Sequence, residues 1–305
     1  MKVSVIVPNY NHAPYLKERL DSILAQTEQD IEVIVLDDCS SDHSMEILLP
    51  YERHPKVRPV VRNTVNSGSP FQQWLRGFEL AQGEYIWIAE SDDVAEPTFL
   101  EESLKRLEQN PQVQMTFSRS IYIDANGQRM DGSPDRPALF QGNGVYNGRE
   151  FALQRMLFRN VIYNASMVVF RKSALKQVSP EFKTFRSGGD WLFWFDIMMQ
   201  GDIAEIPLCL NRFRQHAAKV TVRADKDGRN MAENARCLQH FCSRLRLTAL
   251  QKRSVRGRMT IHFRKKNFAG KEQLKAQFPE FYAGSIGDIL FYELDKWFGI
   301  TGLLR

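Results

Sequence analysis

The stretch that decides the fold is Met-Lys-Val-Ser-Val-Ile-Val-Pro-Asn-Tyr-Asn-His at residues 1–12. Its short apolar, β-branched run at residues 3–7 ends at a proline, which is typical of a strand buried on both faces of a parallel sheet. After Pro14, leucine and isoleucine recur at helical spacing, and a second apolar run follows at residues 31–36. The sequence therefore predicts a strand, a helix and a second, parallel strand.

The same alternation continues to about residue 124 and predicts a parallel sheet covered by helices. We expect helices near 44–49, 71–81 and 97–109, and strands near 57–61, 85–89, 113–117 and 121–124, with Asn126-Gly127 as a hairpin-type turn. Residues 132–148 are rich in Gly and Pro and predict a loop. Beyond it we expect an amphipathic helix, a strand at 167–170, a helix from Asp190 and a mostly helical final eighty residues.

The composition excludes several classes of protein. Hydrophobic residues make up 43% of the 305 and charged residues 25%, which is too much core material for a disordered chain and the wrong composition for a fibre. The longest apolar runs fall far short of the ~20 residues that span a bilayer. Four cysteines without a CxxC pair indicate reduced thiols, and the first residues predict a strand rather than a secretory signal, so we expect a cytoplasmic protein.

Positive charge is concentrated near the C-terminus. Residues 223–275 hold fifteen Lys or Arg against four Asp or Glu, a local charge of +11 in a chain whose formal net charge is +5. This block is either a solvated helical face or a surface for anionic lipid, nucleic acid or an acidic polymer. No zinc-finger spacing or RNA-binding aromatic motif accompanies it, so nucleic acid ranks last among these partners.

Polar side chains follow three of the predicted strands, at the edge of a parallel sheet where ligands bind. They lie at residues 9–11, at Asp37-Asp38 and at residues 90–93. The adjacent acids Asp92 and Asp93 suit a hard divalent cation, which prefers oxygen ligands. The alternative is that they cap the next helix, and for an isolated pair of acids that interpretation is favoured.

The motifs are specific only in combination. Val-Ser-Val-Ile-Val-Pro-Asn-Tyr-Asn at 3–11, Val-Leu-Asp-Asp-Cys-Ser-Ser-Asp at 35–42 and Gly-Glu-Tyr-Ile-Trp-Ile-Ala-Glu-Ser-Asp-Asp at 83–93 occur in order, and Gly-Gly-Asp-Trp-Leu-Phe-Trp at 188–194 and Arg-Phe-Arg-Gln-His at 212–216 follow. Together they resemble the inverting family-2 glycosyltransferases over residues 1–222. The resemblance implies a GT-A fold, an α/β, Rossmann-like mixed sheet flanked by helices, with a nucleotide-sugar half at 1–110 and an acceptor half at 111–222. The basic, mainly helical region 223–305 lies outside it.

The resemblance also implies roles for individual residues. Pro8, Asn9 and Tyr10 would border the nucleoside, and Asp38 would hydrogen-bond the base. Ser91 and Asp92 would bind the sugar nucleotide, while Asp93 and His216 would hold a divalent metal, Mn²⁺ or Mg²⁺. Asp190 would be the catalytic base, with Trp191 and Asn164 facing the acceptor.

Each of these roles has a structural alternative. Asp190 could be the N-cap of its helix, Trp191 could belong to the core, and Asn164 could cap a turn. His216 lies in a basic segment, 212–219, that we expect to be a loop able to close over the diphosphate.

We expect an inverting enzyme in which a carboxylate accepts the proton of a sugar hydroxyl as it attacks the anomeric carbon of a nucleoside diphosphate sugar, by default a UDP-sugar. The expected acceptor is a glycan or lipid-linked molecule of cell-surface polysaccharide synthesis. The basic region 223–305, with the amphipathic stretch 286–298, would then contact anionic membrane at the cytoplasmic face. The alternatives are a non-catalytic sugar-nucleotide or glycan binding protein on the same fold and a nucleotidyltransferase, although residues 9–12 lack the glycine-rich triphosphate loop of the latter.

Overall fold

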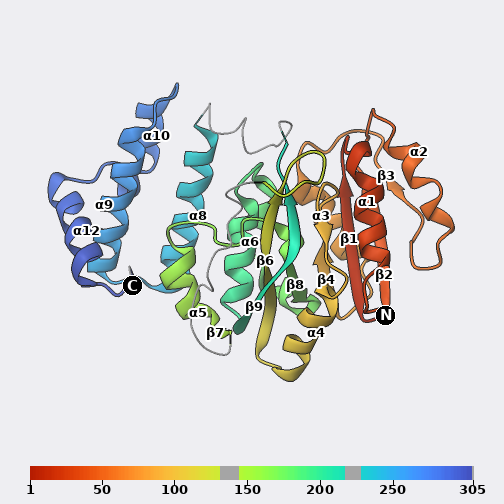
Figure 1. Cartoon of the computed structure of the whole chain (residues 1–305). Helices are drawn as coiled ribbons and strands as arrows, with labels where there is room; N and C mark the ends of the chain where they lie inside the picture. The colour runs from red at the N-terminus through yellow and green to blue at the C-terminus, as the bar shows by residue number, and fades with distance from the viewer. Residues whose placement is uncertain (131–143, 217–227, 304–305) are drawn as a thin grey trace.

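The computed structural model describes residues 1–130, 144–216 and 228–303. Among them, nine strands form one sheet in the order β3-β2-β1-β4-β8-β6-β9-β5, with β7 beside β9 (Figure 1). The strands are β1 (Val3–Asn9), β2 (Ile31–Asp37), β3 (Val61–Arg62), β4 (Tyr85–Ile88), β5 (Val94–Ala95), β6 (Val113–Ile123), β7 (Val145–Asn147), β8 (Val168–Arg171) and β9 (Asp202–Arg214).

Helices cover both faces of this sheet. They are α1 (Ala13–Leu24), α2 (Ser44–Leu48), α3 (Pro70–Leu80), α4 (Phe99–Gln109), α5 (Gly148–Phe151), α6 (Gly189–Met198), α8 (Arg229–Leu245), α9 (Ala249–Lys265), α10 (Lys271–Gln277), α11 (Pro279–Tyr282) and α12 (Ile286–Phe298). One apolar core lies under α1, α2 and α4, and the other under α3, α6 and the C-terminal helices. The predicted α/β architecture with a helical C-terminal region is confirmed.

The sheet is mixed, as the GT-A resemblance implies. Strand β1 runs parallel to both β2 and β4, and β3 runs parallel to β2. Strand β8 is antiparallel to β4 and to β6, whereas β6 and β9 are parallel. The all-parallel alternation read from residues 1–89 is therefore correct for the first half and ends at β8. Because β1, β2 and β4 point the same way, their carboxyl ends meet at one edge.

Three predicted strands are wrong in detail. Residues 113–117 and 121–124 form the single strand β6, because the polar stretch between them stays in the sheet through register shifts at Ser118, Arg119 and Ser120. The strand expected at 57–61 is reduced to a bridge at Val57 and the short β3. Of the loop expected at 132–148, residues up to 143 lie outside the described part of the chain, and the rest contain β7 and the first residue of α5.

Strand β9 was not predicted. Its thirteen residues, Asp-Ile-Ala-Glu-Ile-Pro-Leu-Cys-Leu-Asn-Arg-Phe-Arg, carry no clean alternation because the strand has neighbours on both sides along much of its length. The basic segment expected as a loop from Arg212 therefore starts inside a strand, and residues 217–219 lie outside the described part of the chain. This strand ends two residues before His216.

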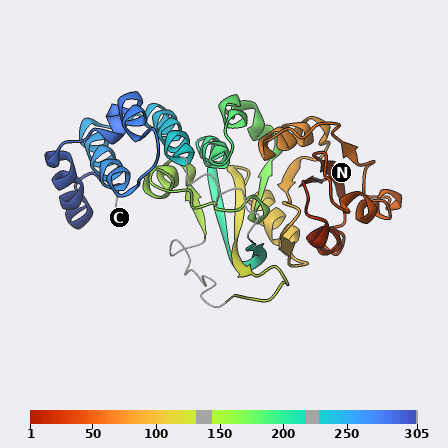
Figure 2. The ribbon, with the colours of Figure 1, turned by 90° about the horizontal axis from the view of Figure 1, so that it is seen from above.

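The C-terminal helices pack on the first part of the chain. The ring of Phe241 on α8 stacks on Phe195 of α6, with centroids 4.0 Å apart. The Arg149 guanidinium on α5 donates to the carbonyl oxygen of Leu245, the last residue of α8, at 2.6 Å. Figure 2 shows these helices gathered at the end of the molecule farthest from β1. The boundary predicted at residue 222 falls outside the described residues, and the two regions share one hydrophobic core. No helix of the described chain is both long and apolar enough to cross a bilayer.

Candidate active site

The candidate site lies at the carboxyl ends of β1, β2 and β4. Backbone hydrogen bonds join the first two: the Asp38 amide donates to the Asn9 carbonyl oxygen at 2.9 Å. The Asn9 side-chain amide donates to Asp37 Oδ2 at 2.8 Å, and the Ser40 amide donates to Asp37 Oδ1 at 3.0 Å. The loops after these neighbouring strands are thus held as one unit.

Asp38 anchors the loop that leads into α3. Its carboxylate accepts hydrogen bonds from the Asn63 side chain at 2.7 Å, from the Gln73 side chain at 2.7 Å and from both the amide and the hydroxyl of Ser67. Both oxygens therefore have donors within the protein. The contact with a nucleotide base that the resemblance implies for Asp38 stays a prediction.

Of the three residues expected to border a nucleoside, only Tyr10 is exposed. Pro8 and Asn9 belong to β1 and are buried, whereas the Tyr10 side chain is 48% exposed just beyond the strand. An exposed aromatic ring at the edge of a parallel sheet can stack on a planar base. Tyr10 is therefore the side chain of this group that the structure offers to a ligand.

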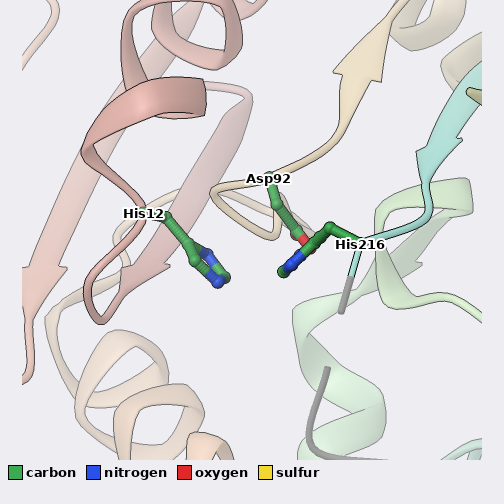
Figure 3. A group of neighbouring side chains, drawn as sticks. All are labelled: His12, Asp92 and His216. Atoms are coloured by element: carbon green, nitrogen blue, oxygen red, sulfur yellow. The ribbon is translucent and has the colours of Figure 1, made fainter. Parts of the chain in front are cut away.

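Asp92 and His216 come together, whereas the metal ligands expected from the resemblance were Asp93 and His216. His216 Nε2 lies 2.9 Å from Asp92 Oδ2, and both side chains are largely buried. His12, from the loop after β1, lies beside them, and its Nδ1 is 2.8 Å from the Ser91 hydroxyl (Figure 3). One ligand atom from each of His12, Asp92 and His216 lies within 4.8 Å of the others. A carboxylate and two imidazoles at this spacing fit a divalent cation.

Asp93, which was expected to hold the metal, has structural partners instead. Its Oδ2 accepts from the Asn164 side chain at 2.7 Å, and its Oδ1 accepts from the Arg214 amide at 3.0 Å, with the residue only 1% exposed. The structure therefore groups Asp92, and not the predicted Asp93, with the histidines, because both carboxylate oxygens of Asp93 are engaged by Asn164 and the Arg214 amide. Asp93 instead ties that turn to β9 and to the segment before β8.

Buried charged groups surround the turn after β4, residues 90–93, which we call the acidic turn. Burial raises the pKa of Asp93 to about 6 and that of Glu90 to about 8, and the charge of Asp92 adds to both shifts. Arg19 of α1 is fully buried over the ring of Trp87, 4.8 Å from its centroid, and burial lowers its pKa to about 10. None of its three guanidinium nitrogens has a hydrogen-bond partner among the described residues, so Arg19 acts on the turn through its charge.

The arginines of the basic segment near His216 make contacts within the protein. The Arg214 guanidinium donates to the Asp92 carbonyl oxygen at 2.7 Å and pairs with Glu18 at 2.5 Å. Arg212 pairs with Glu96 at 2.7 Å. These two cations hold β9 to the turn after β4, so the predicted clamp on a diphosphate is not available from them. Sequence reasoning missed this role because it took the segment for a loop.

Asp190 lies in the first turn of α6. The N-cap of that helix is Gly188, so the alternative in which Asp190 caps it is wrong. Asp190 Oδ2 accepts from the Asn160 side chain at 2.8 Å. Burial raises the pKa of Asp190 to about 7, against the opposing effect of its hydrogen bonds. A carboxyl group with a pKa near neutrality is suited to accepting a proton.

Helix α3 connects the start of α6 to the same edge of the sheet. The Ser69 hydroxyl at the start of α3 donates to the Phe185 carbonyl oxygen at 3.2 Å. A Cβ on Gly189 would lie 2.7 Å from the ring of Phe71, so only glycine allows this approach. Farther along α3, the Trp74 indole donates to Glu90 at 3.1 Å. One helix thus connects the loop of Asp38, the acidic turn and the segment that carries Asp190.

Glu233 is a residue that the sequence analysis missed. It lies on α8 and its carboxylate accepts four hydrogen bonds from the segment just before Asp190: from the amides of Arg186, Ser187 and Gly188 at 2.7, 3.1 and 2.7 Å, and from the Ser187 hydroxyl at 2.8 Å. The available signal was that Glu233 is the single acid between residues 228 and 271 of a strongly basic region. A helix outside the region of resemblance therefore holds the segment of the candidate base.

The two residues expected to face an acceptor are buried instead. Trp191 is 6% exposed, its indole donates to the Met156 carbonyl oxygen at 2.8 Å, and Phe241 packs edge-on against it. Asn164 caps a short helical turn through the Ser166 amide at 2.7 Å while it donates to Asp93. Both follow the structural alternatives, because each polar group is already satisfied inside the protein.

Comparisons with known proteins agree with this arrangement. The sequence profile described as Glycosyl transferase family 2 matches residues 4–179. The crystal structure of residues 1–349 of S. aureus TarS in complex with UDP-GlcNAc superposes with a TM-score of 0.68 at 20% identity, covering 96% of this chain and 82% of that one.

Curated relatives match shorter parts. An uncharacterised glycosyltransferase of Nostoc is 34% identical over 133 residues, 43% of this chain and 40% of its own length. One of Haemophilus influenzae is 28% identical over 216 residues, 70% of this chain and 65% of its own length. The poly(ribitol-phosphate) beta-glucosyltransferase of Bacillus spizizenii is 40% identical over 95 residues, 30% of this chain and 15% of its own length. The chain thus spans less than two thirds of these relatives.

A mixed sheet of this order, with an acidic turn and histidines at its carboxyl edge and helices on both faces, defines a GT-A type glycosyltransferase fold. The family profile covers more than half of the chain. The chain belongs to glycosyl transferase family 2.

Proposed function

We propose that this chain is an inverting, metal-dependent hexosyltransferase. It transfers a sugar from a UDP-sugar to a hydroxyl group of a glycan or lipid-linked acceptor in cell-surface polysaccharide synthesis. The observation that carries the proposal is the Asp190 carboxyl group, whose pKa burial raises to about 7, at the start of a helix that α3 connects to the edge holding Asp92, His12 and His216.

The choice of donor is supported by two observations. TarS, which has the same fold, has been crystallised with UDP and with UDP-GlcNAc. In this chain, Tyr10 offers an exposed ring beside Pro8, Asn9 and the Asp38 loop, where a uracil base can stack. The Bacillus spizizenii relative, named for glucosyl transfer to poly(ribitol-phosphate), supports a polymeric acceptor.

Asp92 and His216 would hold the divalent cation, Mn²⁺ or Mg²⁺. When bound, such a cation neutralises charge on a departing diphosphate and orients the donor. The other residues of the turn support these two side chains: Asp93 fixes Asn164 and the Arg214 amide, and the Arg214 side chain holds the Asp92 carbonyl oxygen. The residues that hold the ion are thereby kept in place before a donor arrives.

Asp190 accepts the proton of the acceptor hydroxyl group while its oxygen forms a bond to the anomeric carbon. The bond from that carbon to the diphosphate breaks in the same displacement, so the configuration inverts and no protein nucleophile is needed. The hydroxyl is a weak nucleophile at neutral pH, and a well-placed base contributes on the order of 10²- to 10⁴-fold to such a step.

The region 223–305 would contact anionic membrane at the cytoplasmic face, where lipid-linked acceptors are found. Its helix α12 exposes Ile286, Leu290, Leu294, Trp297 and Phe298, with exposed fractions of 50–80%. Their spacing places most of them on one face of the helix, and the neighbouring helices carry the basic block. An amphipathic helix beside basic residues is suited to the surface of an anionic bilayer.

The test compares Asp190→Asn with the wild-type chain in UDP-sugar transfer and hydrolysis with Mn²⁺. We expect a loss of turnover of about 10²-fold or more, with donor binding unchanged, because the general base is removed and the donor contacts stay. Asp202→Asn, at the start of β9, is the matched control and keeps its activity.

Two outcomes contradict the proposal. Full turnover by Asp190→Asn assigns the base to another residue. Saturable binding of a nucleotide sugar by the wild-type chain, without turnover of any donor in a panel, favours a non-catalytic binding protein on this fold.

A further inference from the structure

Three side chains from separate segments converge at the carboxyl edge of the sheet. His12 follows β1, Asp92 follows β4 and His216 follows β9, and Figure 3 shows the three pointing toward one another. The ligand atoms of all three lie within 4.8 Å of one another, and the two imidazole rings meet edge to face with centroids 5.4 Å apart. The sequence motifs include His12, but the proposed function leaves it without a role.

Neighbouring groups hold both imidazoles in place. Ser91 fixes His12 through the contact at its Nδ1, 2.8 Å away. The ring of Tyr15 packs against His12 and His216, with centroid distances of 6.0 and 5.2 Å. The Arg214 guanidinium also lies over the Tyr15 ring, 4.8 Å from its centroid. The cluster is therefore built by packing from α1 and β9.

The donor set decides which cation fits. Mg²⁺ takes oxygen ligands and usually retains several waters, so an all-oxygen site with one or two carboxylates suits it. Imidazole nitrogen favours first-row transition metals, whose affinity rises from Mn²⁺ to Co²⁺. Two histidines and one carboxylate, with further positions left open, form a known type of site for such metals.

We propose that His12 is a third protein ligand, so that His12, Asp92 and His216 form a two-histidine, one-carboxylate site that prefers Mn²⁺ or Co²⁺ to Mg²⁺. This inference rests on the proposed function, because it concerns the ion that accompanies the donor. The remaining coordination positions are left to diphosphate oxygens and water.

The experiment uses the full chain with Mn²⁺ alone as the probe and no donor. Electron spin-echo modulation of bound Mn²⁺ counts the coordinated imidazoles: we expect two in the wild type and one in His12→Ala. A Mn²⁺ titration followed by electron paramagnetic resonance is expected to show at least the 10-fold weakening that loss of even an outer-sphere partner causes. Competition by Mg²⁺ is expected to be weak. His43→Ala is the matched control, since His43 is exposed and contacts Glu46 on α2.

Equal imidazole counts in wild type and His12→Ala overturn the proposal, as does equal affinity of the wild type for Mn²⁺ and Mg²⁺. If His12→Ala is not folded, His12→Gln keeps a polar group beside Ser91 without an imidazole, and retention of both nitrogen couplings in it also overturns the proposal. The experiment does not measure sugar transfer. Either result therefore leaves the proposed function unaffected, and the Asp190→Asn experiment tests that function separately.

Discussion

At the scale of single residues, Asp93 and Asp190 show how surroundings separate two buried acids. Burial raises the pKa of both, to about 6 and about 7. Asp93 accepts from Asn164 and from the Arg214 amide, one donor on each oxygen, and so serves as a structural tie. Asp190 takes one side-chain hydrogen bond, from Asn160 to Oδ2, and stays partly exposed. Of these two acids, only Asp190 combines access with a pKa suited to proton transfer.

This pKa predicts a pH dependence. Turnover is expected to rise with pH and level off above about 7, because Asp190 accepts a proton only when ionised. The effect on stability has the opposite sign. The folded pKa is raised, so Asp190 favours folding at low pH, and this contribution is lost as the pH rises toward 7.

Two measurements check this prediction. The pH profile of kcat/KM gives the position of the acid limb. The melting temperature of the wild type relative to Asp190→Asn is expected to fall between pH 5 and pH 8. A profile that is flat through pH 7, together with a constant difference in melting temperature, contradicts a raised pKa at Asp190.

At the scale of elements, α8 and α6 act as a pair although they come from different regions of the sequence. Phe241 of α8 stacks on Phe195, and Glu233 binds the segment 186–188. Hydrogen bonds to a charged acceptor contribute about 1.5–3 kcal/mol each at most, and less when they share one carboxylate. The C-terminal region thus holds the segment that leads into Asp190.

Glu233→Ala is predicted to lower kcat by roughly 10- to 100-fold with little change in the KM for the donor, because displacement of a catalytic group by about 1 Å has an effect of that order. Glu233→Gln keeps an acceptor oxygen and is expected to recover part of the loss. Steady-state kinetics checks both. Glu280→Ala, which removes an exposed acid of α11 that accepts from Gln239, is the control. Equal activity of Glu233→Ala and Glu280→Ala contradicts a positioning role.

At the scale of the whole molecule, helix α12 lies at the end opposite β1 (Figure 2). Trp297 and Phe298 are 80% and 76% exposed, and Lys296 lies beside them. Burial of such a side chain contributes about 1.5–3 kcal/mol, which is enough to change partitioning several-fold or more. The distance of α12 from the candidate site makes this surface separable from catalysis.

Trp297→Ala with Phe298→Ala is predicted to weaken binding to vesicles of anionic phospholipid by roughly 10-fold or more, as measured by flotation, with sugar transfer to a soluble acceptor unchanged. Val65→Ser, which alters an exposed apolar residue in the first half of the chain, is the control. If the double variant binds vesicles as tightly as the control, the result contradicts a membrane contact through α12.

Much of the fold could be predicted because local sequence patterns determine many of its strands and helices. The apolar runs of β1, β2 and β4 and the helical spacing of α1 and α3 depend on neighbours in the sequence, and all five elements were expected. Strand β9 could not be predicted, because its pairing with β5, β6 and β7 decides which side chains are buried. The polar middle of β6 was misread for the same reason.

By itself, the sequence determined the order of strands and helices in the first half, the acids and histidine that follow the strands, and the family. Tertiary structure alone decided which of those side chains meet: Asp92 with His12 and His216, Asp93 with Asn164, and Glu233 with the segment before Asp190. The physical reason is the distance along the sequence over which each signal acts. Periodicity reports burial along one element, whereas a site is made by side chains from distant elements whose directions are set by how the sheet and helices pack.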